Sequence, residues 1–220
     1  KKYYNKEMEK IFNKYYEMFN ECNIFISVID FVKSSSKIAC MYGYCKPSIV
    51  NKNKGYIDAI KLRHPIIERI IDYEYIPNDV HLGNELKGML LYGLNASGKS
   101  VFMKAIGLSI IMAQSGMYVP ADNFTFSPYN SLYTRITGDD NIFRGLSSFG
   151  LEMLELNAIL KRTGEYTLII GDEVCRGTEH ISGNAIVAST IIKLSKSNST
   201  FIFTTHLHEI MDLQEIQQLK

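Results

Sequence analysis

The feature that most constrains the fold of this chain is the eight-residue segment Gly93 to Ser100, which reads GLNASGKS. It matches the pattern G-x-x-x-x-G-K-[ST], in which glycines let backbone N–H groups turn toward a phosphate at the start of a helix. Apolar residues predict a strand over 89–92, and the residues after the segment predict a helix over 99–114, which is the context this pattern needs. Lys99 is therefore expected to reach the β- and γ-phosphates of a nucleotide, and the Ser100 hydroxyl to bind Mg²⁺. The alternative, a glycine-rich turn with an incidental lysine, leaves the flanking strand and helix unexplained.

Short apolar runs alternate with helical stretches in the rest of the chain, and this alternation predicts an α/β sheet with helices on its faces. Further strands are expected over 131–136, 166–171 and 200–204, and further helices over 147–161 and 184–194. The central residues of the last two strands are uninterrupted apolar runs, as expected for strands that are buried on both faces. With 46% hydrophobic and 21% charged residues, the 220-residue chain can form a sizeable core without disulfides.

Two acidic residues, Asp172 and Glu173, directly follow the strand expected over 166–171. An acidic pair at a strand end is weak evidence alone, but a nucleotide triphosphatase needs a carboxylate on the metal side of the phosphates. Asp172 is expected to hold Mg²⁺ through water, and Glu173 to accept a proton from the attacking water or to orient it. Because the second acid has a role only when water is the nucleophile, the pair favours hydrolysis over phosphoryl transfer to a small molecule.

A histidine, His206, follows the last expected strand. Ligands of open α/β sheets bind at the carboxyl ends of the strands, so Gly93, Asp172 and His206 are expected to converge on one crevice. There His206 is placed to sense the γ-phosphate. A surface or capping histidine is the alternative for this residue taken alone.

The N-terminal part of the chain has a different pattern, with apolar residues alternately three and four apart from Met8 to Val32. This spacing predicts a helix of the coiled-coil or bundle type. Three serines at 34–36 and a polar stretch at 51–55 interrupt the pattern, so a domain boundary is expected between residues 34 and 55.

Charge and cysteine content narrow the class of protein further. The formal net charge is +1, so global charge gives no argument for a nucleic-acid or membrane partner. The four cysteines form no Cys-x-x-Cys pair, which argues against zinc and for a reducing, intracellular compartment. No apolar run approaches the length of a spanning helix, so no membrane association is expected.

The order of motifs resembles the C-terminal ATPase domain of the MutS DNA mismatch-repair family, which belongs to the ABC-type ATPases. The matching segments are RHPIIE at 63–68, YIPND at 75–79, MAQSGMYVPA at 112–121, RITGDDNI at 135–142, GLSSF at 145–149, DEVCRGT at 172–178 and TTHLHE at 204–209. The resemblance implies a P-loop NTPase fold of the ABC-ATPase type, a mixed sheet flanked by helices. It also implies that residues 1–46 are the end of a long lever helix and that residues 47–220 are the ATPase domain, incomplete at its C-terminus.

The resemblance also implies the site and its cofactors, ATP or ADP with Mg²⁺. Tyr75 would stack on the adenine, Asn95 would contact the γ-phosphate, and Ser147 would reach the nucleotide of a partner subunit, with a plain helix cap as the alternative for Ser147. The nucleotide-binding residues implied are Tyr75, Gly93, Asn95, Ala96, Ser97, Gly98, Lys99, Ser100, Val101 and, in trans, Ser147. The catalytic residues implied are Glu173, Lys99 and His206, and the metal ligands are Ser100 and Asp172.

Three departures from the family pattern stand out. Cys175 replaces the usual glycine, Leu94 replaces the usual proline, and Ala96-Ser97 replace Met-Gly or a similar pair. None of these departures removes a catalytic side chain, but Cys175 adds volume to a tight turn. The pattern is most similar to the branch of the family found in large DNA viruses and some organelles.

By resemblance, the function is ATP binding and hydrolysis that drives the conformational cycle of a dimeric mismatch-repair clamp. The expected partners are a second copy or a paralogue, through the ATPase face, and mismatched double-stranded DNA, through parts outside this chain. The expected location is the cytoplasm or nucleus, with a viral factory or an organelle as alternatives. Two alternative functions remain open: a non-hydrolysing, ATP-dependent dimerisation switch, and a related ATPase that controls recombination.

Overall fold

The computed structural model describes residues 1–94, 97–135, 148–175 and 180–205. The chain forms two compact units, residues 1–42 and residues 43–220. The first unit is the single helix α1 (Lys2–Tyr42), 41 residues long. It continues through the three serines at 34–36 because neither glycine nor proline occurs before Gly43, which adopts a φ of +60° and ends the helix in the manner of a left-handed C-terminal glycine.

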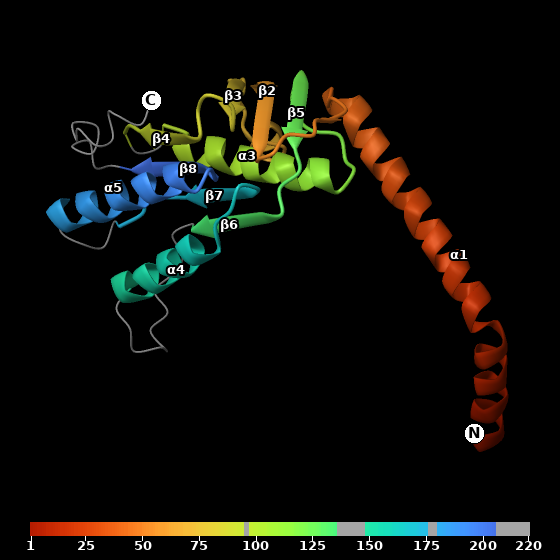
Figure 1. The fold of residues 1–220 in the computed structure, drawn as a ribbon. Helices are drawn as coiled ribbons and strands as arrows, with labels where there is room; N and C mark the ends of the chain where they lie inside the picture. Colours follow the sequence, from red (N-terminus) through yellow and green to blue (C-terminus); the bar gives the residue numbers. More distant parts are fainter. Residues whose placement is uncertain (95–96, 136–147, 176–179, 206–220) are drawn as a thin grey trace. The chain divides into compact units, whose positions relative to one another are not determined.

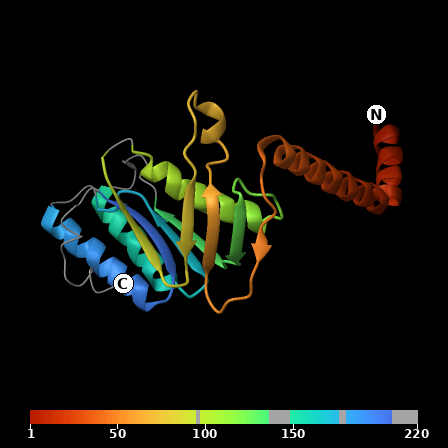
Figure 2. The ribbon, with the colours of Figure 1, turned by 90° about the horizontal axis from the view of Figure 1, so that it is seen from above.

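The second unit contains two four-stranded sheets. The smaller sheet has the order β1-β5-β2-β3, with β1 and β5 parallel and the other neighbours antiparallel. Its elements are β1 (Ser48–Ile49), β2 (Tyr56–Leu62), the short α2 (Ile67–Ile70), β3 (Asn78–Leu82) and β5 (Asn123–Ser127). Figure 2 shows these four strands side by side.

The other sheet is entirely parallel and has the order β4-β8-β7-β6. Its strands are β4 (Gly88–Tyr92), β6 (Ser131–Arg135), β7 (Thr167–Gly171) and β8 (Thr200–Thr205), and its helices are α3 (Lys99–Gln114), α4 (Ser148–Arg162) and α5 (His180–Lys196). The expected strands and helices of this region are confirmed, most of them to within one or two residues. The smaller sheet is mixed, as the family resemblance implied, and the strands of the other sheet are all parallel.

The elements of the second unit stack in layers, with α3 between the two sheets and with α4 and α5 on the far face of the parallel sheet (Figure 1). Strand β7 shows how the sequence specifies this arrangement. Leu168 and Ile170 belong to the core that α3 shares with both sheets, whereas Ile169 belongs to the core under α4 and α5. All five residues of β7 and all six of β8 are buried, which confirms the expectation from their apolar runs.

Helix α3 packs very closely on the parallel sheet. A Cβ atom at Gly107 would lie 2.7 Å from Cδ1 of Ile170, so a larger residue here would displace the end of that side chain. Within the described part of the chain, no helix is long and apolar enough to cross a membrane.

Candidate functional site

The parallel direction of β4, β8, β7 and β6 places their carboxyl ends on one edge of the sheet. The glycine-rich loop leaves this edge after β4, and the acidic pair leaves it after β7. The register aligns Tyr92 of β4 with Thr205 of β8, and Phe203 of β8 with Gly171 of β7. Segments that are more than a hundred residues apart in the sequence therefore meet at one site.

The glycine-rich loop leads directly into α3. Gly98 is the N-cap residue, with a φ of +90°, and no side chain within the described residues caps the first turn of the helix. The first N–H groups of α3 are consequently available to an anion, where the helix dipole also favours negative charge. Lys99 Nζ donates hydrogen bonds to the carbonyl oxygens of Gly93 and Leu94, each at 2.7 Å, so its charge lies over the loop.

The first turn of α3 contacts the acidic pair directly. Ser100 Oγ donates a hydrogen bond to Oδ1 of Asp172 at 2.9 Å, and Asp172 is only 6% exposed. These are the two residues expected to bind the metal, and the fold brings their oxygen atoms together across 72 positions of sequence. A hydroxyl and a carboxylate are hard oxygen ligands of the kind that Mg²⁺ prefers, so the pair fits this ion.

The turn after β7, residues 172–175, is held from three neighbouring elements. The backbone N–H of Asp172 donates to Arg135 O at the end of β6, 2.7 Å away. The N–H of Glu173 donates to Thr204 Oγ1 on β8, and that of Cys175 donates to Glu152 Oε1 on α4, each at 2.8 Å. This network restrains the backbone that carries Glu173.

Cys175, which stands where the family pattern has glycine, is buried in this turn with a φ of +67°. Burial, with the nearby Glu152 carboxylate, raises the pKa of the Cys175 thiol to about 12. The side chain is therefore a neutral thiol at physiological pH and acts as a small apolar group in the core under α4 and α5.

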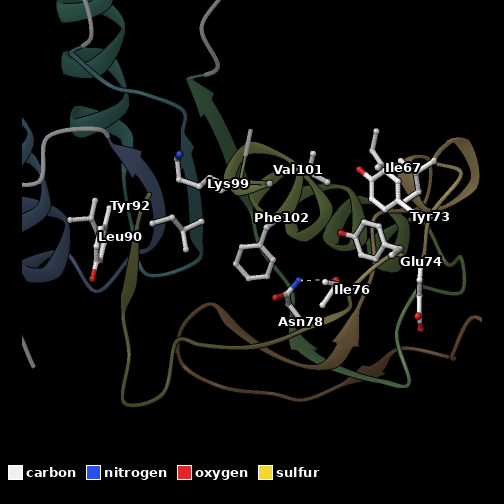
Figure 3. Close-up of a pocket in the computed structure, with 15 residues that line it drawn as sticks. Ile67, Tyr73, Glu74, Ile76, Asn78, Leu90, Tyr92, Lys99, Val101 and Phe102 are labelled. Carbon is white, nitrogen blue, oxygen red and sulfur yellow. Dashed lines mark hydrogen bonds between the residues drawn. The ribbon is translucent and has the colours of Figure 1, made fainter. Parts of the chain in front are cut away.

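A cavity of about 660 Å³ extends from the glycine-rich loop along α3. Such a volume is typical of small-molecule sites. Figure 3 shows Lys99 between Phe102 of α3 and the strand residues Leu90 and Tyr92, with Tyr73 and Ile67 on the far side of Phe102. Lys99 supplies the positive charge of the cavity, and the part of the lining that includes Tyr73 and Ile67 is mainly aromatic and aliphatic, with Glu74 beside them.

Tyr75 also lines this cavity and is half-buried. Burial raises the pKa of its phenol, and a hydrogen bond with the backbone of His64 acts in the opposite direction. That bond ties the ring to the segment before α2. Tyr75 therefore presents an aromatic side chain to the cavity.

The structure brings most of the expected site residues together. Ser97, Gly98, Lys99, Val101 and Tyr75 line the cavity, and Gly93 contacts Lys99. Ser100, in the first turn of α3, bonds Asp172 at the end of β7, and Glu173 follows Asp172 in the chain. The expected roles of Asn95, Ala96, Ser147 and His206 fall on residues outside those described.

Sequence reasoning missed two residues of the site, Thr204 and Glu152. Both contact the backbone of the turn after β7. Each stands in or beside a segment that resembles the family, but the sequence assigned neither residue a role. Burial gives the clearest signal, since Thr204 is 1% exposed and Glu152 is 6% exposed. For Thr204 the sequence did offer a hint, since it directly follows the apolar run at 201–203.

Comparison with known proteins agrees with this geometry. Residues 89–220 match the family model described as MutS domain V. A putative DNA mismatch repair protein mutS homologue of Acanthamoeba polyphaga mimivirus is 45% identical, over 100% of this chain and 23% of that protein. A mitochondrial DNA mismatch repair protein mutS homologue of Sarcophyton glaucum is 40% identical, over 97% of this chain and 22% of that protein. The DNA mismatch repair protein MutS of Staphylococcus epidermidis is 38% identical, over 87% of this chain and 22% of that protein.

The chain spans less than a quarter of the length of these relatives. The family model nevertheless covers more than half of the chain, including the acidic turn and almost all of the parallel sheet. Identity of 38% to 45% over nearly the whole chain supports the same assignment. The chain belongs to the MutS family.

Proposed function

We propose that this chain is the ATPase part of a MutS-family protein, which binds ATP with Mg²⁺ and hydrolyses it. The observation that carries the proposal is the 2.9 Å hydrogen bond between Ser100 and Asp172. It joins the start of α3, where Lys99 lies, to the strand end that carries the second acid, Glu173. A loop that only bound phosphate would have no need of this second acid.

The cavity supports a specific orientation of the nucleotide. The phosphates lie at the loop, where Lys99 and the first N–H groups of α3 supply positive charge. Asn95 is assigned to the γ-phosphate in this arrangement. The adenine extends toward the other end of the cavity and stacks on Tyr75.

For hydrolysis, Glu173 accepts a proton from water as the water oxygen attacks the γ-phosphorus. The bond from that phosphorus to the β–γ bridging oxygen breaks, and ADP leaves with the electron pair. Ser100 and Asp172 hold Mg²⁺, which supplies charge neutralisation to the phosphate oxygens. Lys99 stabilises the same charge, and His206 is assigned to the γ-phosphate.

In the intact protein, we propose, the ATPase cycle opens and closes a dimeric clamp on mismatched DNA. The support is the family and the names of three relatives, each described as a DNA mismatch repair protein or its homologue. The partner is a second copy or a paralogue, and Ser147 of one subunit completes the nucleotide site of the other. The viral and mitochondrial relatives favour a viral factory or an organelle as the location.

ATP turnover per molecule, measured across a wide range of chain concentrations with Mg²⁺, tests this proposal. Glu173→Gln is expected to lose turnover by a factor on the order of 10² to 10⁴ while still binding ATP. Glu165→Gln is a matched control, because it makes the same change at an exposed residue just before β7, at the opposite end of that strand. It is expected to retain full turnover.

Three outcomes separate the alternatives. Turnover that rises with chain concentration supports a site completed by a partner subunit, whereas turnover independent of concentration contradicts a role for Ser147 in trans. Binding without turnover at every concentration contradicts the ATPase proposal and favours the non-hydrolysing switch. Activity that survives in Glu173→Gln contradicts the assignment of this residue.

A further inference from the structure

The hydroxyl of Thr204 lies between the two acidic residues of the site. Its Oγ1 atom is 2.6 Å from Oδ1 of Asp172 and 2.8 Å from the backbone nitrogen of Glu173. Thr204 belongs to β8, which is adjacent to β7 in the parallel sheet, and its side chain is fully enclosed. One side chain of a neighbouring strand therefore contacts both members of the acidic pair.

The direction of these two hydrogen bonds is fixed by chemistry. The backbone N–H of Glu173 can only donate, so Thr204 Oγ1 accepts from it. The single hydroxyl proton of Thr204 is then directed to the carboxylate of Asp172. Hydrogen bonds to a charged group are stronger than neutral ones, and the buried position removes competition from water.

The backbone of Glu173 needs such a restraint. Its φ is +48°, a left-handed conformation that residues with a Cβ rarely adopt, so an unrestrained turn would favour other conformations. The bond from its N–H to Thr204 holds the residue in this conformation from one side of the turn. The bond from Thr204 to Asp172 fixes the carboxylate that Ser100 also contacts.

We propose that Thr204 is a positioning residue for ATP hydrolysis, whose hydroxyl holds the Asp172 carboxylate and the Glu173 backbone in one fixed relation. This inference rests on the proposed ATPase function. Thr204 lies beneath the acidic pair and acts through it, so its loss disturbs alignment and leaves the nucleotide cavity intact. The cavity-lining residues do not include Thr204.

Thr204→Val tests the proposal, because valine has nearly the same shape and lacks the hydroxyl. We expect kcat to fall about 10- to 100-fold, as is typical when a catalytic group is displaced, with the affinity for ATP changed less than about threefold. Thr204→Ser keeps the hydroxyl and is expected to retain kcat within about threefold of the parent chain. Thr204→Ala is the second variant without a hydroxyl if valine prevents folding.

Thr200→Val is the matched control. Thr200 is a buried threonine at the start of the same strand, and its hydroxyl contacts Tyr129 Oη at 3.0 Å and the carbonyl of Thr167 at 3.2 Å. Its replacement removes a buried hydroxyl from β8 at the end remote from the acidic pair. We expect it to reduce stability and to leave kcat unchanged.

Amide hydrogen exchange at Glu173 gives a readout that is independent of activity. The exchange rate of this N–H is expected to rise in Thr204→Val and to remain at the parent value in Thr204→Ser and Thr200→Val. A parent chain that does not hydrolyse ATP contradicts the proposed function, while the exchange rates still test the restraint by Thr204. The inference is overturned if Thr204→Val keeps both kcat and the Glu173 amide exchange rate of the parent chain. It is also overturned if Thr204→Val loses ATP affinity and kcat to the same extent, because an equal loss indicates a general structural role.

Discussion

The two segments that meet at the site, the glycine-rich loop after β4 and the turn after β7, reach unusual backbone conformations in opposite ways. In the described part of the loop, the positive-φ residues are glycines, Gly93 at +151° and Gly98 at +90°. The turn places side chains there, Glu173 at +48° and Cys175 at +67°. Glycine adopts such conformations without help, whereas other residues need support from their surroundings.

The hydrogen bonds of the two segments differ accordingly. In the loop, Lys99 bonds the carbonyls of Gly93 and Leu94, all within seven positions of sequence. In the turn, the N–H groups bond to β6, β8 and α4. The comparison indicates that phosphate binding depends on a local sequence, whereas the alignment for hydrolysis is distributed over the fold.

Removing the positive charge of Lys99 from the loop is expected to give the largest change, a loss of ATP affinity. Lys99→Met keeps an unbranched side chain and loses the ammonium, so ATP affinity should fall on the order of 100-fold, since hydrogen bonds to charged groups contribute about 1.5–3 kcal/mol each. Titration with a fluorescent ATP analogue measures this change. Lys104→Met, on the same helix but outside the set of cavity-lining residues, is the control. Affinity within threefold of the parent in Lys99→Met would contradict the local account of phosphate binding.

The turn should respond differently when one of its distant supports is removed. Glu152→Ala leaves the buried N–H of Cys175 without its acceptor, which should lower the free energy of unfolding by about 1–3 kcal/mol with little change in ATP affinity. Glu152→Gln keeps an acceptor oxygen and should cost less. Urea denaturation measures both changes.

Glu155→Ala is the control for this prediction. Glu155 lies on the same helix and forms an ion pair with Arg135 at 3.0 Å, but its side chain is 45% exposed, so its loss should cost no more than about 1 kcal/mol. If Glu152→Ala is no more destabilising than Glu155→Ala, the turn does not depend on α4.

The difference between the loop and the turn also explains which parts of the site the sequence could predict. The loop was predicted with its helix, because its pattern is contiguous and its flanking elements have clear periodicity. Asp172 was expected near Ser100, since parallel strands share an edge, and the structure places the two side chains in contact. The roles of Thr204 and Glu152 could not be predicted, because the backbone N–H groups and the Asp172 carboxylate that they contact are positioned by the packing of separate elements.

In the fold, too, the parts with a local sequence pattern were predicted and the parts without one were not. The parallel sheet was expected from alternating strands and helices, and the burial of β7 and β8 agrees with their apolar sequences. The smaller sheet was not expected, because its pairing joins β2 to β5 across α3 and the parallel strand β4. Such non-local pairing leaves no periodic signal between the paired segments.

A smaller effect is expected from adding a side chain to the loop. At Gly98 an added Cβ would have no atom within 4 Å, so Gly98→Ala meets only the cost of a left-handed alanine, about 1–2 kcal/mol. Thermal unfolding without nucleotide measures this cost. Gly164→Ala is a suitable control, because Gly164 also has open space around its Cβ position but no positive φ. Equal stability of the two variants would show that the loop tolerates side chains as the turn does.

The smallest expected effect comes from placing glycine in the turn, and it is measured by comparing Cys175→Gly with Cys175→Ala. Both variants lose the buried thiol, so their difference isolates the backbone conformation at φ +67°. If the neighbours of the turn impose this conformation, the free energy of unfolding of Cys175→Gly should exceed that of Cys175→Ala by about 1 kcal/mol. This is expected despite the greater flexibility of glycine in the unfolded chain. Urea denaturation at equal slope measures the difference. If Cys175→Ala is at least as stable as Cys175→Gly, the turn relaxes to a negative φ once the thiol is gone. The left-handed conformation of residue 175 would then depend on packing of the Cys175 side chain rather than on the three hydrogen bonds of the turn.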